Sequence, residues 1–90
     1  MKPASFSIRF AVSAKKDLRR LPESQQLKVV KRILELASEP RPNGISKLQG
    51  ADSVCRIRCG DYRIVYRIDA AEVIIVIIKI GHRSDVYKNL

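Results

Sequence analysis

The sequence has few of the residues that cross-link small proteins or carry metal and membrane chemistry. Its 90 residues include no tryptophan, two cysteines, one histidine, and nine acidic residues against 18 lysines and arginines. The longest apolar run, Val73–Ile78, is far shorter than the ~20 residues that span a bilayer. The first residues contain no apolar stretch typical of a secretory signal. We therefore expect a cytoplasmic protein with no membrane partner.

The two cysteines predict neither a disulfide nor a metal site. Cys55 and Cys59 fall within one expected strand, which would place their Cα atoms about 13 Å apart, too far for a disulfide. Two cysteines and a single histidine are too few ligands for a typical zinc site. We expect two reduced cysteines, no metal and no cofactor.

Length and charge limit the classes of function. Ninety residues form one domain, so residues 1–90 are treated as a single unit without room for a second cofactor-binding domain. A hydrophobic content of 46% excludes a disordered chain. The net charge of +9 favours an anionic partner, which is nucleic acid, a membrane surface or an acidic protein.

The first half of the chain is expected to form one strand and two helices. Residues 4–10 alternate in polarity, as in a half-buried strand. Ser13 is expected to cap a short helix over residues 14–20. A second helix is expected from Pro22 to about Ser38. Its apolar positions recur at helical spacing at Leu27, Val30, Ile33, Leu34 and Ala37.

The second half predicts three strands, over residues 54–59, 62–69 and 73–80, with Gly81 ending the last. The last strand is apolar on both faces, which is typical of a central strand. The element order is β-α-α-β-β-β. The sequence therefore predicts an α+β domain, with two helices packed on one face of a small, mostly antiparallel sheet.

The turn at Gly60-Asp61 has a consequence for the basic residues. A two-residue hairpin turn there pairs Cys59 with Tyr62 and Arg58 with Arg63. One face is then apolar and suited to the helices, and the other carries Arg56, Arg58, Arg63 and Arg67. Opposed like charges destabilise a strand pair, whereas the guanidinium fork suits phosphate. The arginines make either a solvated basic face or, as we favour, a phosphate-binding surface.

The C-terminal segment adds three candidates. Arg83 and Tyr87 are four residues apart, so a helical turn would place both on one side. His82 is the only side chain whose unperturbed pKa lies near neutrality. A lone histidine is structural, or simply exposed, or takes part directly in the chemistry.

Four segments together resemble the RelE branch of the RelE/ParE toxin superfamily. They are Lys47-Leu48-Gln49-Gly50, Arg56-Ile57-Arg58, residues 60–66 (GDYRIVY) and residues 80–87 (IGHRSDVY). The resemblance implies a toxin of a type II toxin-antitoxin system, an endoribonuclease that cleaves mRNA in the ribosomal 30S A site and inhibits translation. It also implies an acidic antitoxin that wraps the toxin, with mRNA and rRNA as further partners.

By position, the resemblance assigns the family's basic pair to Arg56 and Arg58, and further catalytic residues to Arg63, Arg83 and Tyr87. Arginines would stabilise the phosphorane, and Tyr87 would act as the base or stack on a nucleotide. Known members carry lysines in the pair. Arginine is a poor proton donor, which leaves two alternatives for the departing 5′-oxygen. Either His82 protonates it, or Arg83 stabilises its charge without a full proton transfer.

Further cations are either solvated helix faces or contacts to the rRNA backbone. They are Lys15, Lys16, Arg19, Arg20, Lys28, Lys31 and Arg32, together with Lys47 before the strands. Two other functions fit the same fold and charge. One is a ParE-like toxin that inhibits DNA gyrase, and the other is a non-catalytic basic RNA-binding module.

Overall fold

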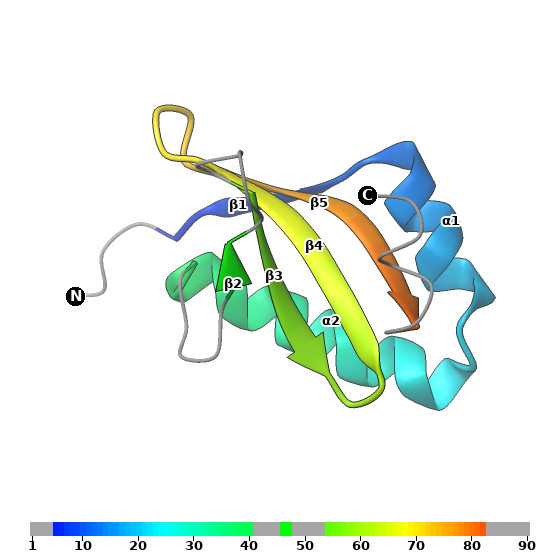
Figure 1. Ribbon diagram of the computed structural model, residues 1–90. Helices are drawn as coiled ribbons and strands as arrows, with labels where there is room; N and C mark the ends of the chain where they lie inside the picture. Colours follow the sequence, from blue (N-terminus) through cyan, green and yellow to red (C-terminus); the bar gives the residue numbers. More distant parts are fainter. Residues whose placement is uncertain (1–4, 41–45, 48–53, 83–90) are drawn as a thin grey trace.

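The computed structural model describes residues 5–40, 46–47 and 54–82 (Figure 1). Its elements in chain order are β1 (Ser7–Phe10), α1 (Val12–Arg20), α2 (Glu23–Ser38), β2 (Ser46–Lys47), β3 (Val54–Cys59), β4 (Tyr62–Asp69) and β5 (Ile74–His82). Within these ranges no helix is long and apolar enough to cross a membrane.

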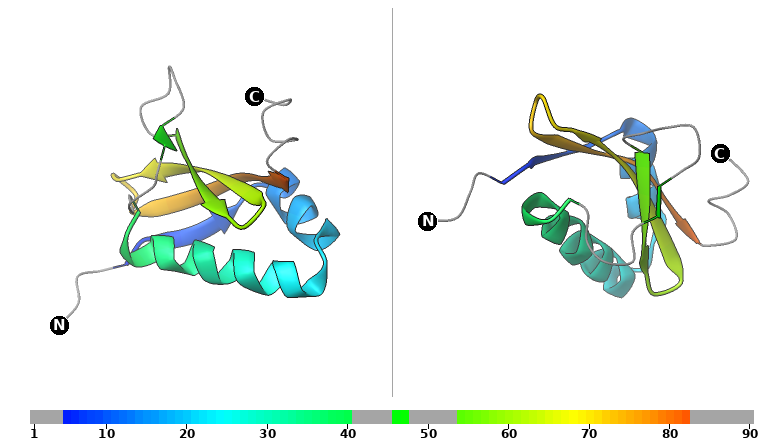
Figure 2. Two further views of the ribbon diagram at one scale, coloured as in Figure 1. Left: turned by 60° about the horizontal axis from the view of Figure 1, so that its bottom comes forward. Right: turned by 60° about the vertical axis from the view of Figure 1, so that its left-hand side comes forward.

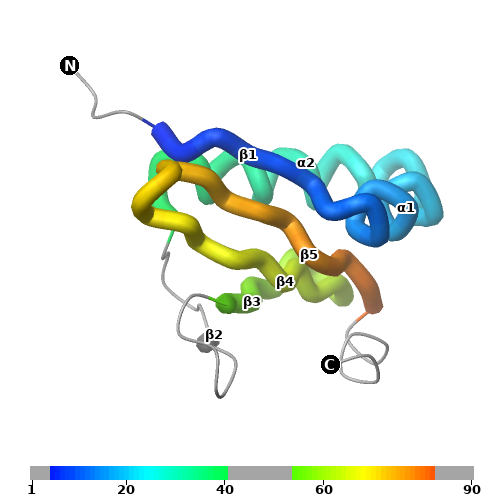
Figure 3. Tube along the Cα trace, turned by 90° about the horizontal axis from the view of Figure 1, so that it is seen from above, coloured from blue at the N-terminus to red at the C-terminus, as the bar shows by residue number. Residues whose placement is uncertain are grey.

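The strands form a single sheet in the order β1-β5-β4-β3-β2, in which β1 pairs with β5 in parallel and the other pairs are antiparallel. Both helices cover the same face, with α1 beside β5 and α2 running along the sheet (Figures 2 and 3). The expected α+β fold, its helix layer and its mostly antiparallel sheet are confirmed. The two-residue strand β2 was not predicted, because so short a segment has no periodicity to detect.

The β3–β4 hairpin has the register that the sequence predicts. Cys59 pairs with Tyr62, and Arg58 pairs with Arg63. Gly60 has φ 61°, the left-handed conformation that a two-residue hairpin turn requires and that glycine adopts without strain. The helix-facing residues of the hairpin are buried at Cys55, Ile57, Ile64, Tyr66 and Ile68. The arginines therefore share the face that the helices leave uncovered.

The last strand differs from the prediction in its end and in its alternation. β5 continues through Gly81 to His82, because Gly81 still pairs with Arg63. A β-bulge lies in β5 where Val65 pairs with Lys79 but Tyr66 pairs with Ile77. One extra residue therefore places Ile77 and Ile80 on the same buried face, three positions apart.

The buried side of α2 also differs from the prediction. Val29, Ile33 and Leu36 are buried, whereas Leu27 and Leu34 are 69% and 60% exposed. The helix has an apolar arc wider than the side that the sheet covers. Periodicity alone could not locate the centre of the buried side within that arc.

The start of α1 corrects the role expected for Ser13. The helix begins at Val12, and its N-cap residue, Ala11, makes no side-chain hydrogen bond. The Ser13 hydroxyl instead donates to the carbonyl oxygen of Ile78, at 3.1 Å. The side chain therefore joins α1 to β5, a contact across the fold that local sequence does not reveal.

Candidate functional site

The uncovered face of the sheet carries two opposed arginines. Arg58 on β3 lies directly across from Arg63 on β4. Arg58 is exposed, Arg63 and Arg56 are half-buried, and Val65, which pairs with Arg56, is fully buried. A buried apolar side chain, Val65, thus lies beside a concentrated positive charge. Such a surface suits an anion better than a neutral ligand.

Arg63 has the least satisfied side chain of this face. Its Nη1 atom is buried and has no hydrogen-bond partner within residues 5–40, 46–47 and 54–82. On its other side Arg63 pairs with Gly81, which has no side chain to cover the guanidinium. A buried donor left unpaired costs about 1–3 kcal/mol, more when it is charged. A phosphate oxygen that reached this buried N–H would accept from it and remove the cost.

Arg67 is different, although the sequence places it on the same face. Its Nη1 lies 3.9 Å from the Asp69 carboxylate, so its charge is partly balanced within β4. We therefore leave Arg67 out of the candidate site, which in the described part of the chain consists of Arg56, Arg58 and Arg63.

The remaining predicted catalytic residues fall in two groups. Arg83 and Tyr87 lie outside the described residues. His82 lies in register with Tyr62, with ring centroids 6.0 Å apart and an interplanar angle of 82°. Alternation along β4 places Tyr62 on the helix side of the sheet, and Arg63 on the other. In the described structure, His82 is therefore next to an aromatic ring and not across from Arg63.

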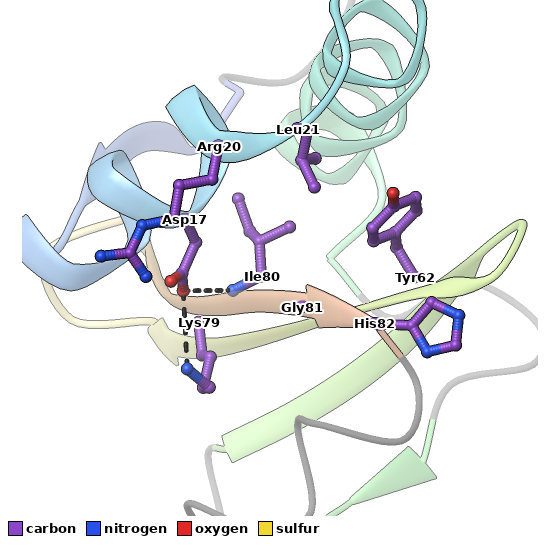
Figure 4. A pocket seen from close by; sticks show the side chains of 8 residues that line it. All are labelled: Asp17, Arg20, Leu21, Tyr62, Lys79, Ile80, Gly81 and His82. Atoms are coloured by element: carbon purple, nitrogen blue, oxygen red, sulfur yellow. Dashed lines mark hydrogen bonds and ion pairs between the residues drawn. The ribbon is translucent and has the colours of Figure 1, made fainter.

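A cavity of about 320 Å³ lies at this end of the sheet (Figure 4). Tyr62 and His82 line it from the strands, and Asp17, Arg20 and Leu21 line it from the helical side. The Asp17 carboxylate accepts a hydrogen bond from the backbone N–H of Ile80 at 3.0 Å and lies 3.8 Å from the Lys79 ammonium. Sequence reasoning missed this contact because its partners are far apart in the chain.

The cations on the helices have several environments. Lys15, Lys16, Arg19, Arg20, Lys28 and Lys31 are exposed. Arg19 and Arg20 occupy the last turn of α1, where a positive charge also complements the helix dipole. Arg32 is half-buried and donates to Glu35 at 2.9 Å. The backbone of Lys47 lies in β2, and its side chain is outside the described set.

The two cysteines are free, with Cys55 buried and Cys59 half-buried. Burial raises the pKa of the Cys59 thiol, although the nearby Arg32 and Lys28 act in the opposite direction. Among residues 5–40 and 54–82, no three histidine, cysteine or acidic side chains gather closely enough to hold a metal ion.

Comparison with known proteins identifies relatives over almost the whole chain. The family model described as the ParE toxin of the type II toxin-antitoxin system, parDE, matches residues 8–87. The chain is 32% identical over 84 residues to Toxin RelG of Mycobacterium tuberculosis, covering 92% of this chain and 97% of that protein. It is 36% identical over 87 residues to the putative toxin RelE1 of Methanocaldococcus jannaschii, covering 93% and 97%.

The fold has the same relatives. A chain in the crystal structure of the RelBE2 toxin-antitoxin complex of Mycobacterium tuberculosis superposes with a TM-score of 0.79 at 31% identity. The match covers 93% of this chain and 98% of that one. Sequence and structure therefore agree on one group of relatives.

Proposed function

Because the chain belongs to the RelE branch of the RelE/ParE superfamily, the toxins of type II toxin-antitoxin systems, we propose that it is a ribosome-dependent endoribonuclease that cleaves mRNA in the A site. The observation that carries the proposal is the unpaired, buried Nη1 of Arg63 on the uncovered face of the sheet. This donor, with Arg58 directly opposite, supports a phosphodiester as the ligand.

The proposed reaction transfers a phosphoryl group within the RNA. The ribose 2′-oxygen bonds to the adjacent phosphorus, and the bond from phosphorus to the 5′-oxygen breaks. The products are a 2′,3′-cyclic phosphate and a 5′-hydroxyl. The 2′-hydroxyl gives its proton to a base, and the 5′-oxygen takes one from an acid. Arg63, Arg58 and Arg56 stabilise the negative charge that develops on the phosphorane between these two events.

The proton-transfer groups belong to the C-terminal end of β5 and the segment beyond it. Tyr87 is the base in this proposal, or it stacks on a nucleotide. Arg83 stabilises the leaving 5′-oxygen. His82 is the candidate acid, and its place beside Tyr62 means that it would have to reach the phosphate from the edge of the sheet. The ribosome supplies the positioning that this small site lacks.

The proposed partners follow from the charge and from the relatives. One relative is a toxin crystallised with its antitoxin, which supports a cognate antitoxin here, and the +9 charge supports an acidic one that wraps the toxin. The exposed lysines and arginines of α1 and α2, with Lys47, would contact the rRNA backbone. A protein that acted on ribosome-bound mRNA in this way would do so in the cytoplasm.

A translation reaction with purified ribosomes and a defined mRNA tests the function, with cleavage mapped by primer extension. The wild-type protein should cut within the A-site codon and leave free mRNA almost intact. Arg63→Ala should lower the rate by about 100-fold or more, as loss of a preorganised donor to an oxyanion does. Arg67→Ala is the matched control, because this arginine lies on the same face but pairs with Asp69. Equal losses in both variants would contradict the proposed site.

The second candidate is inhibition of DNA gyrase, favoured by one observation, which is that the matching family model is described as the ParE toxin. A gyrase supercoiling assay in parallel with the cleavage assay separates the two. Inhibited supercoiling together with intact mRNA on the ribosome would replace our proposal with this one. RNA binding without mRNA cleavage or gyrase inhibition would indicate the remaining alternative, a non-catalytic basic RNA-binding module.

A further inference from the structure

The outer edge of β5 has two different partners along its length. β1 pairs with β5 from Ile74 to Ile77 and then ends, although β5 continues to His82. Beyond Ile77 the edge is covered by α1. The Ser13 hydroxyl donates to the Ile78 carbonyl at 3.1 Å, and the Asp17 carboxylate accepts from the Ile80 N–H at 3.0 Å.

Ser13 and Asp17 are four residues apart on α1, so they lie on one side of the helix, one turn apart. Their partners on β5 are two residues apart, which is the spacing at which backbone groups point to the same edge of a strand. Side chains one helical turn apart on α1 therefore reach backbone groups two residues apart on β5. The two side chains supply the acceptor and the donor that a neighbouring strand would have supplied.

The segment held in this way reaches the candidate site. The inner edge of β5 pairs Ile80 with Ile64, Gly81 with Arg63 and His82 with Tyr62. Because Gly81 pairs directly with Arg63, a shift of Gly81 would change the surroundings of the Arg63 side chain.

We propose that Asp17 is a positioning residue of the proposed nuclease, holding the end of β5 in register through the Ile80 amide, with Ser13 in a supporting part. The inference rests on the proposed function. Asp17 touches neither the substrate nor Arg63, and acts through the backbone of β5. The Asp17 side chain is only 13% exposed and lies 3.8 Å from the Lys79 ammonium, which keeps its carboxylate aimed at the strand.

Three variants separate positioning from folding. Asp17→Ala removes the acceptor, and Asp17→Asn keeps an oxygen that can accept from Ile80 but loses the charge facing Lys79. Asp69→Ala is the matched control. The Asp69 carboxylate also accepts a backbone hydrogen bond, from the N–H of Glu72 at 3.0 Å, but it does so in the turn at the far end of β4 and β5.

Two readouts are used on the full chain, which are single-turnover cleavage on ribosomes and amide hydrogen exchange followed by NMR. Asp17→Ala should lower the maximal cleavage rate by about 10- to 100-fold with little change in the ribosome concentration for half-maximal rate, because a small misplacement of catalytic groups has that effect. Asp17→Asn should restore most of the rate. In Asp17→Ala, exchange should accelerate at Ile80, Gly81 and His82 but stay slow at Ile68 and Ile75.

A wild-type rate in folded Asp17→Ala would overturn the inference, and so would a rate in Asp69→Ala that falls as far. If the wild-type protein itself does not cleave, the proposed function fails. The hydrogen-exchange data then test by themselves whether Asp17 holds the end of β5. Faster exchange confined to the end of β5 in Asp17→Ala supports that role. Unchanged exchange, or faster exchange over the whole sheet, overturns it.

Discussion

Replacing Arg63 by methionine should stabilise the free protein while abolishing cleavage. The wild-type side chain has a buried Nη1 without a partner and a like charge, Arg58, directly across the strand pair. An unpaired buried donor costs about 1–3 kcal/mol, and an opposed like charge adds roughly 0.2–1 kcal/mol. Methionine keeps an unbranched apolar stem in the same place. The free energy of unfolding should therefore rise by about 1 kcal/mol or more.

Thermal unfolding followed by circular dichroism measures this effect. A gain of about 1 kcal/mol raises the Tm of a domain of this size by roughly 4–8 °C. Arg67→Met is the control, since Arg67 already pairs with Asp69 and its side chain is 44% exposed. Its stability should change by no more than about 0.5 kcal/mol, and its cleavage rate should stay at the wild-type value.

Adding an anionic ligand also tests whether the Arg63 side chain lacks a partner in the free protein. A ligand at 100 times its Kd stabilises the state it binds by about 2.7 kcal/mol. A short, uncleavable oligonucleotide should therefore raise the Tm of the wild-type protein much more than that of Arg63→Met. A lower Tm for Arg63→Met without ligand, or equal shifts in both proteins, would refute the idea that Arg63 is held ready for a phosphate.

Three further predictions concern stability and reactivity. Val73 has φ 57°, in the left-handed region that β-branched residues avoid, so Val73→Asn should stabilise the protein by about 0.5–1 kcal/mol in urea unfolding. The Tyr66 hydroxyl donates to the Pro40 carbonyl at 2.6 Å, and Tyr66→Phe should cost about 1 kcal/mol in the same assay; an unchanged midpoint would contradict this role. Because burial raises the pKa of Cys59, its thiolate fraction at pH 7.5 is below that of free cysteine, and alkylation should be slower than in the urea-unfolded chain, accelerating as the pH rises. Equal rates in the folded and unfolded chains would show that the thiol is not shielded.

The parts of the fold that follow from local rules could be predicted from the sequence. A two-residue turn at Gly60-Asp61 determines the pairing of every residue in the β3–β4 hairpin, so the opposition of Arg58 and Arg63 followed from counting. The helices and the order of the elements along the chain followed from periodicity and turn signals, whereas the order of the strands within the sheet was not predicted.

The parts that depend on contacts across the fold could not be predicted in the same way. The bulge at β5 changes which isoleucines face the helices, and no residue type marks it. Ser13 looks like a helix cap but bonds to Ile78, and α2 turns Leu27 and Leu34 outward although they fit the apolar pattern. The unpaired state of Arg63 is likewise a property of its surroundings and not of its position in the sequence.

The parallel pairing of β1 with β5 has a consequence for how the protein is made. β1 is synthesised first, but its partner in the sheet is the last strand of the described chain to leave the ribosome. Pairings between distant segments also slow folding, because the long intervening loop must close first. The candidate site needs Gly81 of β5 beside Arg63 of β4, so it cannot be assembled on a nascent chain before β5 has emerged from the ribosome.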